Sequence, residues 1–161
     1  MSNPNDPDIK VLNGLIETTL DSVDGYREAA KETDNSAYRA LFERRAEERA
    51  GVASDLQACV RSLGGDPEDD GSILAKAHRA FLDIKHALLR NEQSVVDSVE
   101  AGEDHIKAKY ERALEDTKLS ATTRETVRRA YAVVKTGHDQ MRDLKHSLES
   151  RSDADSPVYP T

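Results

Sequence analysis

The stretch AYRALFERRAEERAGVASDLQACVRSL, residues 37–63, decides the fold of this chain. When it is set on an α-helix with the seven-residue repeat of helix bundles, one face is apolar except at its middle. That face consists of Tyr38, Phe42, Arg45, Arg49, Val52, Leu56, Cys59 and Leu63. The repeat therefore predicts a bundle helix that directs Arg45 and Arg49 towards the core.

The composition of the chain agrees with packed helices and argues against some partners. Its 161 residues suffice for one domain with a substantial core, aromatic residues make up only 4%, and Trp is absent. Asp and Glu outnumber Lys and Arg, 31 to 23, for a net charge of −8. Because such a surface repels phosphate groups, we expect neither nucleic acid nor a membrane as a partner.

The start of the sequence and its one cysteine predict a cytoplasmic protein. The first residues, MSNPNDPD, lack the basic start and apolar run of a secretion signal. The sequence has no stretch of about 18 apolar residues that could cross a membrane. Cys59 has no second cysteine for a disulfide and lies on the apolar face, where it serves as a small hydrophobic residue.

Two helices joined by a short turn are predicted in the first half of the chain. An apolar stripe with helical spacing runs through residues 7–32, and Pro7 suits the first position of a helix. Residues 34–36, Asp-Asn-Ser, provide the turn and the cap for the helix over residues 37–63. This second helix is expected to end at Gly64-Gly65, where a left-handed backbone needs no side chain. The two helices therefore form an antiparallel hairpin.

A break is predicted within residues 72–117, which are helical in composition throughout. One unbroken helix there would extend about 69 Å at ~1.5 Å per residue, whereas each helix of the first hairpin extends about 40 Å. We place the break at Asn91, a good cap for a new helix. This gives a shorter helix over residues 73–89 and a bundle-length helix over residues 92–116.

A fourth bundle helix is predicted to begin at Ser120 or Thr122, because Thr122 and Glu125 have the spacing of a capping box. It is expected to end at residue 149, since the residues beyond it lack apolar periodicity and predict a flexible tail. The fold class is therefore an all-α, antiparallel four-helix bundle. The predicted parts are an extension over residues 1–6, the bundle over residues 7–149 and the tail over residues 150–161.

A buried ionic network is predicted around Arg45 and Arg49. Antiparallel pairing about the first turn places Asp24 level with Arg45. The same pairing places Asp21 level with Arg49. Because a buried guanidinium cannot lose its proton, each arginine needs a carboxylate partner. The candidate partners are Asp21, Asp24 and Glu17, with Glu103 as the alternative.

This polar centre has two interpretations. Pairing about the second turn places Glu103 near Val134, about one turn from His138, so carboxylates and a histidine could approach each other as in a di-iron bundle. Such bundles use inward glutamates and Glu-x-x-His pairs. The sequence contains no Glu-x-x-His pair. The pattern therefore favours a salt-bridged layer that sets the register of the helices over a metal site.

Several segments together resemble a known family. They are residues 9–30 with LNGLIETTLDSVDGYREAA, the LGGDPEDDGS loop, His78-Arg79 followed by DIK, and Glu100-Ala101-Gly102-Glu103-Asp104 leading to Tyr110 and Ala113-Leu114. Over roughly residues 9–118 the chain resembles an uncharacterised bacterial family of ferritin-like four-helix-bundle proteins. The resemblance implies a ferritin-like bundle with one additional shorter helix before the third bundle helix. It implies no activity, because the family is a domain of unknown function.

The wider ferritin-like superfamily suggests which positions descend from metal ligands. By this resemblance they are Glu17, Glu47 or Glu48, Glu103 and His138. The chain departs from the metal-binding pattern in lacking the Glu-x-x-His histidines. Arg45 and Arg49 would also add positive charge where a cation should bind.

Three hypotheses follow. The leading one is a non-enzymatic interaction or stress-associated protein without a cofactor, in which an Arg–carboxylate network replaces the metal site; the stress association comes from the resemblance. The alternative is a divergent di-metal oxidase or iron-handling protein that binds iron or manganese through Glu17, Glu48, Glu103 and His138. The third is a homodimer scaffold that uses the helix over residues 73–89.

Overall fold

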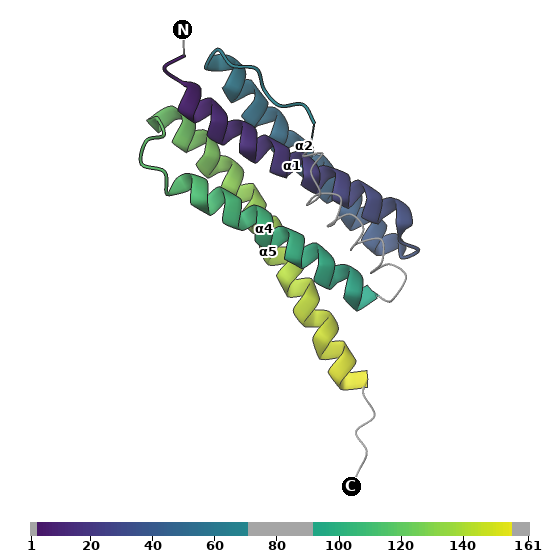
Figure 1. Cartoon of the computed structure of the whole chain (residues 1–161). Helices are drawn as coiled ribbons and strands as arrows, with labels where there is room; N and C mark the ends of the chain where they lie inside the picture. The colour runs from purple at the N-terminus through teal and green to yellow at the C-terminus, as the bar shows by residue number, and fades with distance from the viewer. Residues whose placement is uncertain (1–2, 71–91, 156–161) are drawn as a thin grey trace.

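The computed structural model describes residues 3–70 and 92–155, and this part of the chain forms an all-α bundle (Figure 1). Its helices are α1 (Asp6–Glu32), α2 (Ser36–Ser62), α4 (Glu92–Leu114) and α5 (Ala121–Asp155). None of these four has the length and apolar character needed to span a membrane. The predicted helix over residues 73–89 and the predicted break at Asn91 lie outside the described residues.

Polar side chains cap the start of the second helix in each hairpin, α2 and α5. The Asn35 side chain accepts hydrogen bonds from the backbone N–H groups of Ala37 and Tyr38, each at 3.0 Å. The Ser120 hydroxyl accepts a bond from the N–H of Thr123 at 3.3 Å. These contacts satisfy amides that the first helical turn leaves unpaired. The predicted cap at residues 34–36 is confirmed, and Ser120 rather than Thr122 precedes α5.

An arginine closes each hairpin from the other side of the turn. Arg39 of α2 donates to the carbonyl of Ala30 at 3.2 Å and to that of Thr33 at 2.7 Å. Arg124 of α5 donates to the carbonyl of Leu114 at 2.7 Å, at the end of α4. Carbonyls at a helix C-terminus lack intrahelical donors and attract positive charge. Both turns therefore hold their helices together by the same device.

The end of α2 is sealed by glycine and by the residues before α1. Gly64 has a φ of 80°, so the left-handed end predicted for this helix is confirmed. The Asn3 side chain donates to the carbonyl of Leu63 at 2.8 Å. Asn13 fixes the following loop on α1, because its side chain accepts from the N–H of Glu68 at 2.9 Å.

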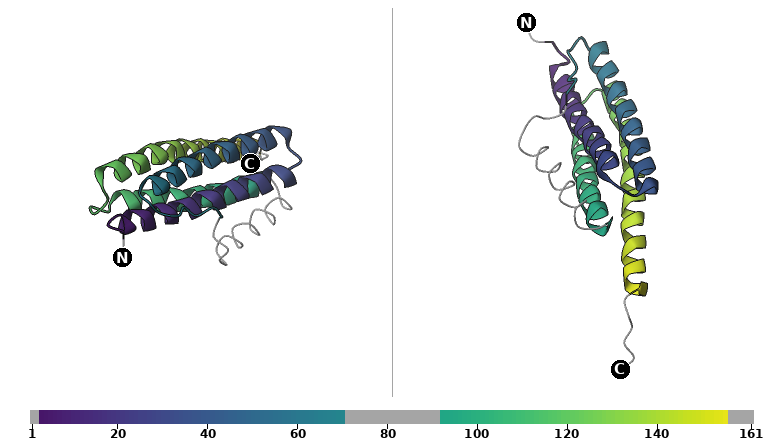
Figure 2. Two further views of the ribbon diagram at one scale, coloured as in Figure 1. Left: turned by 90° about the horizontal axis from the view of Figure 1, so that it is seen from above. Right: turned by 90° about the vertical axis from the view of Figure 1, so that its right-hand side faces the viewer.

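Helix α5 continues to Asp155 and extends past the other helices (Figures 1 and 2). The prediction that a tail begins at residue 150 is therefore wrong for residues 150–155. Residues 138–156 contain neither Gly nor Pro, and the first residue that breaks a helix is Pro157. A helical segment without an apolar stripe has no face that packs on other helices, but the lack of a stripe does not by itself end a helix.

Two apolar clusters fill the core, one at each end of the bundle. The first-turn cluster lies beside the turn between α1 and α2, and its buried residues are Val23, Tyr26, Ala29, Ala30, Phe42, Ala46, Val95, Val96, Val99 and Met141. The second-turn cluster lies beside the turn between α4 and α5, and its buried residues are Leu12, Leu15, Ile16, Val52, Leu56, Val60, Ile106, Tyr110, Ala113, Val127, Ala130 and Val134.

Membership of the clusters defines the directions of the helices. The first-turn cluster takes the end of α1, the beginning of α2 and the beginning of α4. The second-turn cluster takes the beginning of α1, the end of α2 and the end of α4. Helices α2 and α4 therefore run in the same direction, and each is antiparallel to α1 and α5. The end of α2 and the start of α4 lie at opposite ends of the bundle (Figure 1).

Removing the cap of α2 tests this account of the first turn. We expect Asn35→Ala to lower the free energy of unfolding by about 1 kcal/mol, because the N–H groups of Ala37 and Tyr38 lose their acceptor. Asn35→Ser should keep most of the stability, and Ser54→Ala, at an exposed position of α2, serves as the control. Urea unfolding followed by circular dichroism measures all three. Equal stability of Asn35→Ala and the parent protein would contradict the assigned cap.

Candidate functional site: a polar layer between the apolar clusters

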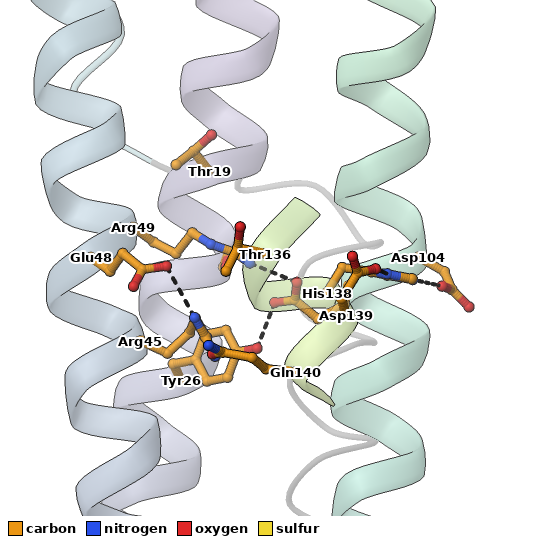
Figure 3. Close-up of polar contacts among 12 residues, drawn as sticks. Thr19, Tyr26, Arg45, Glu48, Arg49, Asp104, Thr136, His138, Asp139 and Gln140 are labelled. Atoms are coloured by element: carbon orange, nitrogen blue, oxygen red, sulfur yellow. Dashed lines mark hydrogen bonds and ion pairs between the residues drawn. The ribbon is translucent and has the colours of Figure 1, made fainter. Parts of the chain in front are cut away.

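A layer of polar side chains, most of them buried, lies between the two clusters, and Figure 3 shows part of it. On α2, Arg49 is flanked by Ala46 of the first-turn cluster and Val52 of the second-turn cluster. On α4, Glu103 has the same relation to Val99 and Ile106. We define the polar layer as Ser22, Tyr26, Arg45, Arg49, Glu103, Gly137, His138 and Gln140.

Arg49 and Glu103 form the centre of the polar layer. Their side chains are 0% and 2% exposed, and Arg49 Nη2 lies 2.6 Å from Glu103 Oε2. The second carboxylate oxygen of Glu103 accepts a bond from the Tyr26 hydroxyl at 2.5 Å. Arg49 Nη1 donates to the Ser22 hydroxyl at 2.9 Å. Three helices, α1, α2 and α4, thus meet in one hydrogen-bonded group.

Arg49 and Tyr26, the two side chains that donate hydrogen bonds to Glu103, are both held in their protonated forms. Burial by itself would lower the pKa of Arg49, but the adjacent Glu103 carboxylate raises it above its ordinary value. Burial, and then the charge of Glu103, raise the pKa of Tyr26 well above its usual value. Arg49 therefore stays a cation, and Tyr26 stays a phenol that can donate its hydrogen bond. The guanidinium carbon of Arg49 also lies 5.9 Å from the centre of the Tyr26 ring, within range of a cation–π contact.

Arg45 connects the polar layer to the surface. Its side chain is buried, and its Nη1 lies 3.0 Å from Oε1 of the half-buried Glu48 on the same helix. Its Nη2 donates to the side-chain oxygen of Gln140 on α5. The Nε–H groups of Arg45 and Arg49 are buried and have no acceptor within the described part of the chain. Such groups are costly to bury, so the fold accepts an energetic penalty at this level.

Gly137 makes room for both guanidiniums. A Cβ atom at this position of α5 would lie 2.8 Å from Arg49 Nη2 and 2.9 Å from Arg45 Nη1. Real Cβ atoms essentially never approach other heavy atoms this closely. A side chain at position 137 would therefore force the ends of the two arginines to shift, and glycine avoids this shift although it disfavours a helix interior.

A second buried hydrogen bond joins α1 to α4 beside the polar layer. The Tyr110 hydroxyl lies 2.7 Å from the Thr19 hydroxyl, which donates to the Leu15 carbonyl at 2.6 Å. Tyr110 therefore acts as the donor to Thr19. Burial raises the pKa of Tyr110 to about 12, although the charge of Arg49 opposes this effect. This phenol, like Tyr26, is neutral at physiological pH.

His138 lies on the side of α5 that faces α4 (Figure 3). It is 5% exposed. Its Nε2 lies 2.5 Å from Asp104 Oδ1, and its Nδ1 lies 3.2 Å from Asp139 Oδ1. The imidazole therefore contacts carboxylates on both sides.

The structure brings together some of the predicted network residues and separates others. Arg45, Arg49 and Glu103 are buried at one level, and Glu103, the alternative in the sequence-based prediction, is the partner of Arg49. Asp24 is exposed, so its predicted place in the buried network is wrong. It is one residue, about 100° of helical rotation, away from the buried Val23. Asp21 is half-buried on α1.

Several residues of the polar layer are missed by reasoning from the sequence. The Tyr26 hydroxyl, Ser22 and Gln140 give no periodic signal, because each reaches a partner on another helix. Gly137 does carry a signal: a glycine inside an otherwise helical stretch, beside a histidine of the apolar face, indicates a close approach of helices.

The suggested metal ligands do not fit a di-metal centre. The described residues contain no group of three or more His, Cys, Asp and Glu side chains that could hold a metal ion. Glu48 is engaged by Arg45, and Glu103 by Arg49 and Tyr26. Glu17 is half-buried on α1. Two guanidiniums at this level would also repel a divalent cation.

Replacing Gly137 with alanine should lower the stability of the protein, whereas the same replacement at a glycine with open space around it should raise the stability. We expect Gly137→Ala to lower the free energy of unfolding by about 1–3 kcal/mol, because the new Cβ overlaps both guanidiniums. Gly102→Ala is the matched control, since a Cβ there meets nothing within 4 Å. It should raise stability by about 0.5–1 kcal/mol. Urea unfolding measures both variants, and a stabilised Gly137→Ala would contradict the packing described.

A double-mutant cycle tests the pairing of Arg49 with Glu103. Each single change, Arg49→Met or Glu103→Met, should lower the free energy of unfolding by about 3–5 kcal/mol, because one charge stays buried without its partner. The double variant should lose less than the sum of the two singles, since it buries neither charge. Urea unfolding gives the coupling energy. Additive losses would show that the two side chains do not interact.

Comparisons with known proteins identify the family but no characterised relative. Among curated proteins, none matches the chain significantly. Residues 8–116 match the family described as domain of unknown function (DUF2383), which covers most of the bundle. The chain therefore belongs to the DUF2383 family.

Proposed function

We propose that the protein is a non-enzymatic, ferritin-like bundle in which an Arg–carboxylate network has replaced the central metal site. The proposal rests chiefly on one observation, the buried Arg49–Glu103 pair in the polar layer. In this view the bundle acts through its surface, as an interaction or stress-associated protein. The stress association rests on the resemblance to the bacterial ferritin-like family. The cytoplasmic location expected from the sequence remains a prediction.

The direction of the helices supports the ferritin-like part of the proposal. The described helices form two antiparallel hairpins, and α2 runs in the same direction as α4. A bundle with this order needs one long connection between its hairpins, which distinguishes ferritin-like folds from simple up-and-down bundles. The resemblance of residues 9–118 to a ferritin-like family points the same way.

The position of the arginines supports the replacement of a metal site. Di-iron bundles gather inward glutamates and Glu-x-x-His pairs from four helices at the middle of the core. In this chain the middle of the core holds Arg45 and Arg49. Glu103 projects inward as a ligand would, but both of its oxygens accept hydrogen bonds from protein groups. The guanidiniums thus supply the positive charge that a metal would bring.

The chemistry of the layer supports a role without catalysis. Tyr26 and Tyr110 are held protonated, and Arg49 keeps its charge. None of these groups is suited to accept a proton near neutral pH. The carboxylate of Glu103 is occupied by hydrogen bonds from Arg49 and Tyr26. We therefore assign the function to the exterior, and the net charge of −8 favours basic over acidic protein partners.

Metal content distinguishes this proposal from the oxidase or iron-handling alternative. The full chain would be produced without a histidine tag in medium supplemented with iron and manganese, purified without chelator, and measured by plasma mass spectrometry. We expect far less than one equivalent of either metal, and the same background in the Glu103→Ala/His138→Ala variant. About two equivalents in the parent protein, lost in the double variant, would contradict the proposal.

A further inference from the structure

The Arg45 guanidinium keeps a buried hydrogen-bond donor unused. Its side chain is 3% exposed, and its ends reach Glu48 on α2 and Gln140 on α5 (Figure 3). Nη1 contacts the Glu48 carboxylate, and Nη2 donates to the side-chain oxygen of Gln140. The Nε–H group is buried and has no acceptor among the described residues. A buried cation therefore has a donor that the surrounding protein does not satisfy.

The unused donor lies on the same edge of the guanidinium as the contact with Gln140. In an arginine side chain, Nε–H and one N–H of Nη2 point in the same direction, so together they bind two oxygens of one carboxylate or a similar oxyanion. On Arg45 a single amide oxygen, that of Gln140, accepts from this edge. A neutral group with one acceptor atom therefore occupies a position that suits an anion with two.

The charges around Arg45 favour a further anion. A second guanidinium lies close by, since a Cβ atom at Gly137 would lie 2.8 Å from Arg49 Nη2 and 2.9 Å from Arg45 Nη1. Arg49 is matched by Glu103, which is 2% exposed. Arg45 is matched by Glu48, which is 36% exposed, so water weakens the attraction between these two charges. Arg45 is therefore the less completely neutralised member of a buried pair of like charges.

We propose that the Nε–Nη2 edge of Arg45 binds a small planar oxyanion of the carboxylate type, of which formate is the simplest, in place of the Gln140 oxygen. The anion accepts hydrogen bonds from both nitrogens, and such charged hydrogen bonds are stronger than the bond to a neutral amide. Gln140 is exposed, so its side chain can turn into solvent when the anion binds. The replacement of a metal site rests on the Arg49–Glu103 pair instead, so either proposal can fail without the other.

Nitrogen-15 NMR of the arginine Nε–H groups tests the site directly. The full chain would be titrated with sodium formate, and sodium chloride at the same ionic strength serves as the reference for charge screening. The signal of Arg45 is assigned by its loss in Arg45→Lys. We expect formate to shift this signal to saturation, whereas chloride shifts it much less. No shift with formate, or equal shifts with the two salts, would overturn the proposal.

Substitutions at Gln140 provide a second readout that leaves both arginines in place. Gln140→Ala removes the competing oxygen, so less formate should be needed for half of the full shift. Gln140→Glu supplies a carboxylate from α5, so the Arg45 signal should be shifted without formate and should no longer respond to it. Ser147→Ala and Ser147→Glu, at an exposed position of α5, are the matched controls and should respond as the parent protein does. An unchanged formate affinity in Gln140→Ala, or a continued response in Gln140→Glu, would refute the site.

Discussion

A guanidinium cannot release its proton, and burying Arg49 with no exposed surface obliges the rest of the core to neutralise it. Glu103 does so from α4. From α1, Tyr26 donates to the second oxygen of Glu103, and Ser22 accepts a hydrogen bond from Nη1 of Arg49. Because residue 137 is glycine, α5 can lie close to the guanidiniums of Arg49 and Arg45. All four described helices are therefore constrained at one level by a single buried charge.

The polar layer and the apolar clusters have different physical roles. The clusters remove large side chains such as Phe42, Leu56 and Met141 from water, and this burial is the main source of stability. A buried ion pair contributes little net stability, because desolvation offsets its Coulomb energy. It does penalise wrong registers: sliding α2 by one turn would move Arg49 away from Glu103 and against apolar side chains. We therefore interpret the layer as the element that specifies how the helices align.

Local signals in the sequence are sufficient for the first hairpin, and insufficient for the partners of the buried arginines. Periodicity, the cap at Asn35 and the glycine at position 64 predicted the first hairpin, because these signals act within a few residues. Periodicity also placed Arg45 and Arg49 in the core. The choice of Glu103 over Asp24 depends on the order and rotation of helices around the core, which no single stripe encodes. The length of α5 was underestimated, because a helix without packing partners leaves no apolar pattern.

Membership of the DUF2383 family identifies relatives of this chain without supplying an activity, so the proposal that can be tested most directly is the replacement of a metal site at the centre of the bundle. The most direct measurement is a crystal structure grown with Mn²⁺, with data collected at the manganese absorption edge. The account predicts no anomalous peak among Glu48, Glu103 and His138, and density for Arg49 bound to Glu103. An anomalous peak at this level, with the guanidiniums displaced, would contradict the claim that arginines have taken the place of a metal.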